Sequence, residues 1–376
     1  MALVQGTTED RFGEVRDVFA ANFDSGLDVG ASVAVYLDGE PVVDLWGGYL
    51  DREHTTPWAA DTITNVWSTT KTMTFVAALT LADRGAIELD APVARYWPEF
   101  AANGKEGVLV RHLMAHTAGL SGWQEKITGA DLYDWEKLTS LLAAQAPWWT
   151  PGEASGYHAL SQGYLIGEVV RRVTGQSFGE FFASEIAGPL GADFHVGLAA
   201  EHDGRVGKVI PPPPPEKLEV LPPMLVRTMT NPFINAKQSW EEAWRRAEIP
   251  AAGGHGNARS VAAAQSVLSC GGEARGVRLF SEATARRVLE EQSNGDDLVL
   301  GMPVRFGMGY ALNSPDPTMH LGPNACYWGG YGGSLIVNDL DTRLTVAFVM
   351  NHMRLGTVGD ERSYALVNAV YRGLGA

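Results

Sequence analysis

The sequence predicts an α+β fold in which an antiparallel sheet, made from both ends of the chain, is flanked by helices and joined by a mostly helical insertion. The region from about 86 to 269 shows mainly helical patterns, interrupted by loops rich in Pro, Gly and Trp. Runs with the character of β-strands lie on either side of it, at 31–37 and 41–46, and at 306–312, 333–337 and 343–350. Strands at both ends with helices between them favour one shared sheet.

This arrangement also predicts two domains. Residues 1–85 and 255–376 would form the sheet domain, and residues 86–254 the helical domain. We expect the active site in the cleft between them.

Composition narrows the class of protein. The 376 residues are 45% hydrophobic, enough for a sizeable core, and the formal net charge is −15. This net negative charge disfavours nucleic acid and acidic lipid as partners and favours a small-molecule substrate. No apolar run approaches the length of a membrane span, and no basic, signal-like segment opens the sequence. We therefore expect no membrane partner, a cytoplasmic location, and reduced structural thiols at Cys270 and Cys326.

The individual elements follow from local patterns. Apolar residues at helical spacing predict a first helix over 9–23, and Asp38-Gly39-Glu40 between two β-like runs indicates a hairpin. A long apolar helix is expected from about Ser68 to Arg84, with Gly85 as its stop. The five prolines at 211–215 predict a stiff surface loop. Two more helices are expected, over 258–268 and at the C-terminus.

Ser68-Thr69-Thr70-Lys71 is the candidate catalytic motif. With 18 Ser and 7 Lys in the chain, chance supplies about 0.3 Ser-x-x-Lys pairs, so one match is weak evidence. An N-cap serine followed by a surface lysine is the alternative. The residues before Ser68 are too apolar for a solvated helix start, and the helix is apolar nearly all round, which predicts that it is buried.

The spacing itself has a chemical use. Residues three apart share a helix face, so the amine can reach the hydroxyl. A free lysine has a pKa near ~10.4, and making it half neutral at pH 7 requires about 4.6 kcal/mol. Burial could supply this, or the ammonium could instead lower the pKa of a second base such as a tyrosine. Tyr157 lies in a suitable Pro/Gly loop, 151–159, although a buried structural tyrosine is an equal alternative.

Together these segments resemble the serine β-lactamase and penicillin-binding-protein superfamily. The resemblance rests on the Ser68 motif, on the loop that ends in Tyr157, and on Trp328-Gly329-Gly330-Tyr331 before a strand. Within the superfamily the chain looks most similar to esterases related to class C β-lactamases, called family VIII carboxylesterases. Further segments in the expected order are 112–120, 186–191, 253–260 and 304–310.

The resemblance implies roles for particular residues. Ser68 would be the nucleophile, Lys71 and Tyr157 the base pair, and the N–H groups of Ser68 and Tyr331 the oxyanion hole. Trp328, Gly329 and Gly330 would contact substrate, and Trp123 and Gln124 would line the acyl pocket unless they serve only in packing. No metal or cofactor is expected.

Two departures from class C β-lactamases bear on the substrate. Ala159 replaces an Asn two residues after the tyrosine, and Trp328 replaces the Lys that opens the third motif. An indole in place of a cation favours uncharged esters over β-lactams. We therefore expect a serine hydrolase that cleaves esters of short to medium acyl chain. The alternatives are a β-lactamase or peptidase-type amidase, an acyltransferase using the same site, or a catalytically silent scaffold.

Three other patterns have structural interpretations. Gly175-Gln176-Ser177-Phe178-Gly179 matches the nucleophile motif of α/β-hydrolases but follows a helix, so Ser177 is expected to cap the next helix with Glu180. His112 and His116 lack the acidic partner of a zinc motif. His255, in a Gly-rich turn, is expected to form local hydrogen bonds.

Overall fold

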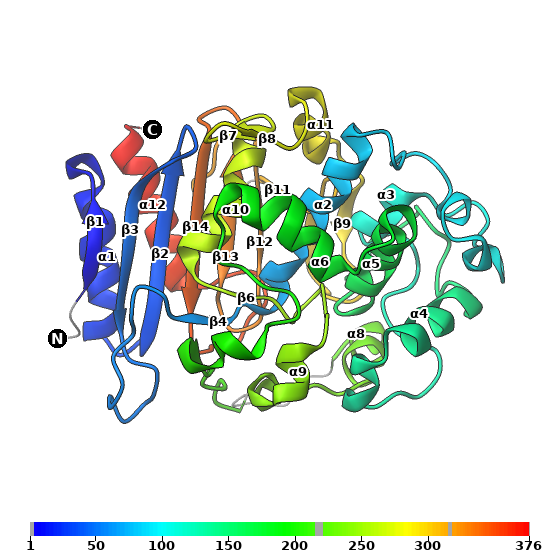
Figure 1. Ribbon diagram of the computed structural model, residues 1–376, viewed down its shortest axis with the longest axis horizontal. Coiled ribbons are helices and arrows are strands. Elements are labelled where there is room, and N and C mark those ends of the chain that lie inside the picture. The colour runs from blue at the N-terminus through cyan, green and yellow to red at the C-terminus, as the bar shows by residue number, and fades with distance from the viewer. Residues whose placement is uncertain (1–3, 215–220, 315–317, 376) are drawn as a thin grey trace.

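A nine-stranded antiparallel sheet forms the centre of the molecule in the computed structural model, which describes residues 4–214, 221–314 and 318–375. Its strands come from the first 48 residues and from the last third of the chain, as predicted (Figure 1). In spatial order they are β1 (Gln5–Thr8), β3 (Glu40–Gly48), β2 (Gly30–Leu37), β14 (Leu344–Met350), β13 (Leu335–Asp339), β12 (Ala325–Gly329), β11 (Ala311–Leu312), β10 (Pro303–Phe306) and β9 (Ser293–Asp296).

The pairing of β2 with β14 joins the two ends of the chain. Leu37 lies opposite Leu344 and Ala31 opposite Met350, so the whole length of β2 is paired. Strand β2 continues into β3 through a two-residue turn in which Asp38 has φ 52° and Gly39 φ 82°. Positive φ at both turn residues is the geometry that suits the twist of a hairpin. The predicted hairpin and the sheet shared by both termini are therefore confirmed.

Helices cover both faces of the sheet (Figure 1). Helices α1 (Gly13–Asp24) and α12 (Glu361–Leu374) pack together on one face, and α10 (Ala258–Ser269) lies on the other, against β2, β13 and β14. All seven residues of β14 are buried, as expected for a strand covered on both sides. The predicted helix at Ser68 is α2 (Lys71–Asp83), which packs against α10 and α5 (Ser161–Thr174) and is buried from Lys71 to Leu81.

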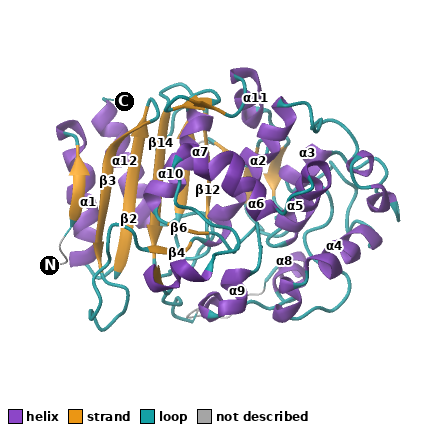
Figure 2. Cartoon of the chain, viewed as in Figure 1, coloured by secondary structure: helices purple, strands orange, loops and turns teal. Residues whose placement is uncertain are grey.

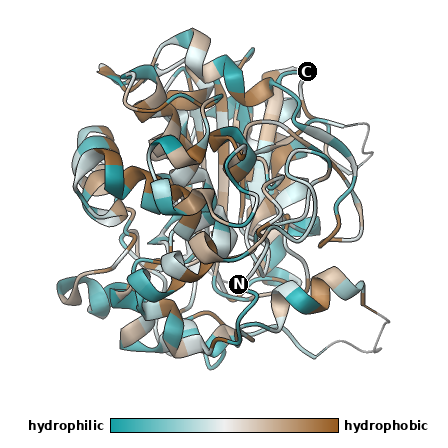
Figure 3. Ribbon diagram, turned by 90° about the vertical axis from the view of Figure 1, so that its right-hand side faces the viewer, coloured by the Kyte–Doolittle hydropathy of each residue, from teal (hydrophilic) through white to brown (hydrophobic). Residues whose placement is uncertain are grey.

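Helices α3 (Val110–Met114), α4 (Trp135–Ala144), α5 and α8 (Pro223–Met229) lie at the end of the molecule away from the termini (Figure 2). The short strands β4 (Ile63–Asn65), β5 (Val206–Gly207) and β6 (His255–Gly256) form a small three-stranded sheet, and β7 (Glu273–Ala274) pairs with β8 (Val277–Arg278). Seen from the helical end, apolar stretches concentrate on the central strands, while the outer helices alternate in hydropathy (Figure 3). The other helices are α6 (Phe178–Phe182), α7 (Gly188–Leu190), α9 (Glu242–Arg246) and α11 (Glu282–Arg286).

Several expectations need adjustment. The strand predicted over 306–312 is two short strands, β10 and β11, because Gly309 has φ 99° and the N–H of Gly307 bonds to the carbonyl of Tyr310. In the large sheet, strands β1, β9 and β12 were not predicted. Residues 211–214 form neither helix nor strand, and the last proline of that run lies outside the described residues. Within the described ranges, no helix combines the length and apolarity needed to cross a bilayer.

Candidate active site

Ser68 lies in a tight turn at the start of the central helix. A 3-10 turn, Trp67–Thr70, leads directly into α2. Trp67, just before Ser68, has φ 51° and is 4% exposed. A bulky residue in the left-handed region costs on the order of 1–3 kcal/mol and persists only where its surroundings enforce it. This left-handed conformation turns the chain at Trp67, so that Ser68 lies at the start of a buried helix.

Hydrogen bonds from two other segments hold this turn in place. The N–H of Val66 donates to the carbonyl of Gly254 (2.9 Å), and the N–H of Gly254 donates to Thr70 Oγ1 (2.9 Å). From the sheet, Ser334 Oγ donates to the carbonyl of Val66 (2.9 Å) and lies 2.9 Å from Thr69 Oγ1. The nucleophile turn is therefore tied both to the loop before α10 and to the start of β13.

Lys71 is completely buried beside Ser68. Its Nζ lies 3.0 Å from Ser68 Oγ, 2.7 Å from the carbonyl oxygen of Ala159 and 2.9 Å from that of Ala251. No carboxylate of the described residues forms an ion pair with it. Burial lowers the pKa of Lys71 well below its usual range. The sequence left open whether burial would neutralise this lysine or its ammonium would lower the pKa of a second base, and the geometry favours burial.

Tyr157 covers Lys71. The Lys71 Nζ lies 4.8 Å from the centre of the Tyr157 ring. Burial raises the pKa of Tyr157, although the Ser68 hydroxyl and the Trp328 indole lie near enough to oppose that shift. The phenol oxygen is buried and forms no hydrogen bond of ordinary geometry with the described residues. Both shifts favour an uncharged pair, an amine and a phenol, next to the serine.

Tyr331 lies across from the nucleophile turn. Gly330 packs so closely there that a Cβ on it would lie 3.2 Å from the backbone N of Ser68. The Tyr331 ring contacts Trp67, with centroids 5.7 Å apart. The backbone at Gly330, next to Tyr331, therefore lies close to that of Ser68, as an oxyanion hole made of their two N–H groups requires.

An apolar cavity of about 270 Å³ opens over these groups. Ser68, Tyr157 and Tyr331 line it, together with Trp67, Ala159, Leu160, Ala252 and Thr357. The outer wall comes from the end of α8 and the loop after it, and includes Phe233, whose surface is 71% exposed. None of the residues found to line the cavity is charged. The members of the outer wall are Thr228, Met229, Pro232, Phe233 and Ile234.

The other predicted contact residues do not line the cavity. Trp328 is buried behind Tyr157, with ring centroids 5.2 Å apart, and it does not line the cavity; neither do Gly329 and Gly330. Trp123 is buried and donates its indole N–H to the carbonyl of Leu138. Gln124 pairs with Arg227. The geometry of Trp123 and Gln124 favours the packing alternative.

The serine and the histidines for which the sequence favoured structural roles form local hydrogen bonds. Ser177 accepts from the Glu180 N–H and Glu180 accepts from the Ser177 N–H, a capping box at the start of α6. His112 and His116 accept hydrogen bonds from the backbone N–H groups of Leu109 and His158. His255 bonds locally to Gly253.

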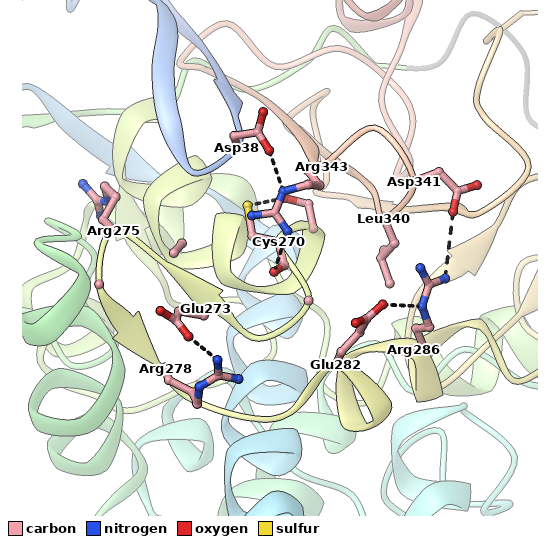
Figure 4. Close-up of a pocket in the computed structure, with 14 residues that line it drawn as sticks. Asp38, Cys270, Glu273, Arg275, Arg278, Glu282, Arg286, Leu340, Asp341 and Arg343 are labelled. Atoms are coloured by element: carbon pink, nitrogen blue, oxygen red, sulfur yellow. Dashed lines mark hydrogen bonds and ion pairs between the residues drawn. The ribbon is translucent and has the colours of Figure 1, made fainter.

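A larger cavity, of about 660 Å³, lies at the C-terminal end of α10 (Figure 4). The nucleophile turn, by contrast, is bonded to the loop before the N-terminal end of that helix. Charged side chains line this second cavity, and most of them form ion pairs: Asp38 pairs with Arg343, Glu273 with Arg278, and Glu282 and Asp341 with Arg286. The described residues that line it include no pair of nucleophile and base comparable to Ser68 and Lys71.

Some contributors to the site were not expected from the sequence. The Ala251 and Ala159 carbonyls act through the backbone, and a backbone atom leaves no signal in residue type. Phe233 and its neighbours lie in a region without a recognisable motif.

The fold and this constellation define a class of protein, and the chain belongs to it: it matches the Beta-lactamase family over residues 19–371. It is 37% identical to the esterase/beta-lactamase LipL of Mycobacterium tuberculosis, over 94% of this chain and 83% of that protein. A family VIII carboxylesterase structure aligns with a TM-score of 0.94 at 41% identity, over 99% of this chain and 100% of that one. A penicillin-binding protein homolog from Caulobacter crescentus aligns with a TM-score of 0.93 at 36% identity, over 99% and 100% of the two chains. The superfamily resemblance carried by the sequence motifs is therefore confirmed.

Proposed function

We propose that this protein is a serine carboxylesterase that cleaves uncharged esters through an acyl-enzyme on Ser68. The observation that supports this proposal most directly is the environment of Lys71. Its Nζ has two backbone carbonyls and Ser68 Oγ as its nearest polar partners, at 2.7, 2.9 and 3.0 Å. A neutral amine has two N–H groups and one lone pair. The two carbonyls occupy the N–H groups, and the lone pair is then left for the Ser68 proton.

In the reaction, Ser68 Oγ attacks the ester carbonyl while its proton passes to Lys71. The oxyanion is held by the backbone N–H groups of Ser68 and Tyr331, each worth about 3 kcal/mol in such sites. Tyr157, kept as a phenol by burial, donates its proton to the leaving alcohol and recovers one through Lys71. Water then attacks the acyl group and releases the acid.

The cavity supports an ester over a β-lactam. Its described lining is mainly apolar and carries no cation, so a substrate carboxylate would be buried without a partner. A volume of about 270 Å³ is small for a ligand pocket and suits a short to medium acyl chain. The names of the esterase LipL and of the carboxylesterase structure agree with this choice.

Three measurements test the proposal. Rates on p-nitrophenyl butyrate should exceed those on a chromogenic cephalosporin; the reverse order would identify a β-lactamase. A fluorophosphonate probe should label Ser68 in the folded protein and fail to label Ser68→Ala. Absence of labelling on native protein would indicate a scaffold without catalytic activity. An acyltransferase would be revealed by a product ester when a second alcohol is added.

A further inference from the structure

Asp297 is a buried carboxylate that bonds to the backbone of Tyr157. It follows β9, one of the two edge strands of the sheet, and is 1% exposed. Its Oδ1 accepts the N–H of Tyr157 (3.0 Å) and those of Val299 and Leu300 (both 2.9 Å). One oxygen atom thus connects the turn after β9 to the residue that covers Lys71.

A second contact aligns the same two segments. The N–H of Leu298 donates to the carbonyl of Ser155 (2.9 Å). Val299, fully buried, belongs to the small apolar cluster that contains Tyr157, Phe306 and Trp328. The turn after β9 therefore fixes the Tyr157 backbone through a hydrogen bond and contributes Val299 to the apolar cluster that contains the Tyr157 side chain.

The remaining oxygen atom, Oδ2, is buried without a hydrogen-bond partner among the described residues, and no described cation pairs with the carboxylate. Burying an unpaired charge is costly. A serine or asparagine could cap such a turn at a lower cost. The charge has an effect on the proposed mechanism, because it opposes ionisation of the neighbouring phenol.

We propose that Asp297 is a positioning residue that holds Tyr157, as a proton donor, over Ser68 and Lys71. The inference rests on the proposed role of Tyr157. Asp297 itself lies behind the tyrosine and is absent from the residues that line the described cavity.

The test uses the leaving group of the ester. Ethanol leaves only with a proton, whereas p-nitrophenolate leaves readily without one. Loss of a positioned Tyr157 should therefore slow ethyl butyrate more than p-nitrophenyl butyrate. We expect Asp297→Ala to lower kcat on ethyl butyrate about 10²-fold, with a smaller loss on the p-nitrophenyl ester. Asp297→Asn, which keeps an acceptor oxygen, should recover much of this loss. Asp296→Ala is the matched control, because Asp296 is the adjacent, exposed carboxylate.

A purely structural role predicts other results. Equal losses on the two esters would overturn the proposal. The proposal would also be overturned if Asp297→Ala lowered kcat as much in a Tyr157→Phe background as in the native protein. We expect Asp297→Ala to lower kcat by no more than about twofold in that background. A crystal structure of Asp297→Ala with the phenol unmoved would overturn it as well. A different result would refute the esterase proposal: native protein that a fluorophosphonate labels at Ser68 but that hydrolyses neither ester.

Discussion

Replacing Gly330 by alanine tests how closely the segment after β12, which carries the proposed oxyanion-hole N–H of Tyr331, must approach Ser68. A Cβ at this position would lie 2.2 Å from the carbonyl oxygen of Val66, 2.4 Å from Ser334 Oγ and 3.2 Å from the backbone N of Ser68. Ordinary non-bonded contacts are about 3.5 Å, so the strand and the nucleophile turn must separate by roughly 1 Å. The Ser334–Val66 hydrogen bond would be lost with that movement.

A displacement of that size at a catalytic centre costs about 10²-fold in rate, or about 2.7 kcal/mol of activation free energy. This is close to the cost of removing one oxyanion donor. We therefore expect Gly330→Ala to lower kcat on p-nitrophenyl butyrate by about 10²-fold, with a much smaller change in KM. The assay is steady-state kinetics, accompanied by the melting temperature of each variant.

Two controls separate catalysis from stability. Gly107→Ala meets no heavy atom within 4 Å and should behave as the native protein. Gly329→Ala lies in the same segment, but its Cβ would meet the backbone of Val358 and Gly359 at 2.7 Å, away from Ser68. It should lower the melting temperature with a smaller loss of kcat. A folded Gly330→Ala protein with native kcat would refute the reasoning.

Three further predictions concern the base and the alternative serine. Lys71→Met should lower kcat about 10²–10⁴-fold, because the general base is lost; a native rate in steady-state kinetics would exclude Lys71 from this role. Because burial lowers the pKa of Lys71 and the neutral amine is the active form, kcat/KM should fall as pH decreases through that lowered pKa. A pH profile that rises only above about 10 would contradict this. Ser177→Ala should leave kcat unchanged and reduce the free energy of unfolding by about 1 kcal/mol through loss of the helix cap. Chemical denaturation measures that reduction, and a large loss of activity in the folded variant would return Ser177 to consideration as a nucleophile.

The sequence predicted the centre of the fold better than its edges. Strands β2 and β14 have long apolar runs, and a two-residue turn at Asp38 and Gly39 marks the hairpin. Strand β1, Gln-Gly-Thr-Thr, has no apolar period at all and becomes a strand only because the edge of β3 is available. The break between β10 and β11 depends on a glycine conformation that composition does not determine.

The candidate site divides in a similar way. Ser68 and Lys71 lie on one helical turn, so their spacing alone predicts that they meet. Tyr157 was located through the chemistry that a lysine base requires, and the structure places its ring over Lys71. The position of Trp328 behind Tyr157 depends on how the two segments pack, which the sequence does not determine. The roles of these residues, and the division of the chain into two domains, stay predictions until variants are measured.

The pairing of β2 with β14 has a consequence during synthesis. The ribosome makes residues 30–37 long before their partners at 344–350. Until then one edge of β2 is an apolar strand with unpaired backbone groups, a surface prone to aggregation. Tyr331 is also made late, so a nascent or truncated chain carries Ser68 and Lys71 without the opposing strand. Activity should therefore appear only after the sheet is complete. Until then, chaperones that shield the nascent chain would protect it from aggregation.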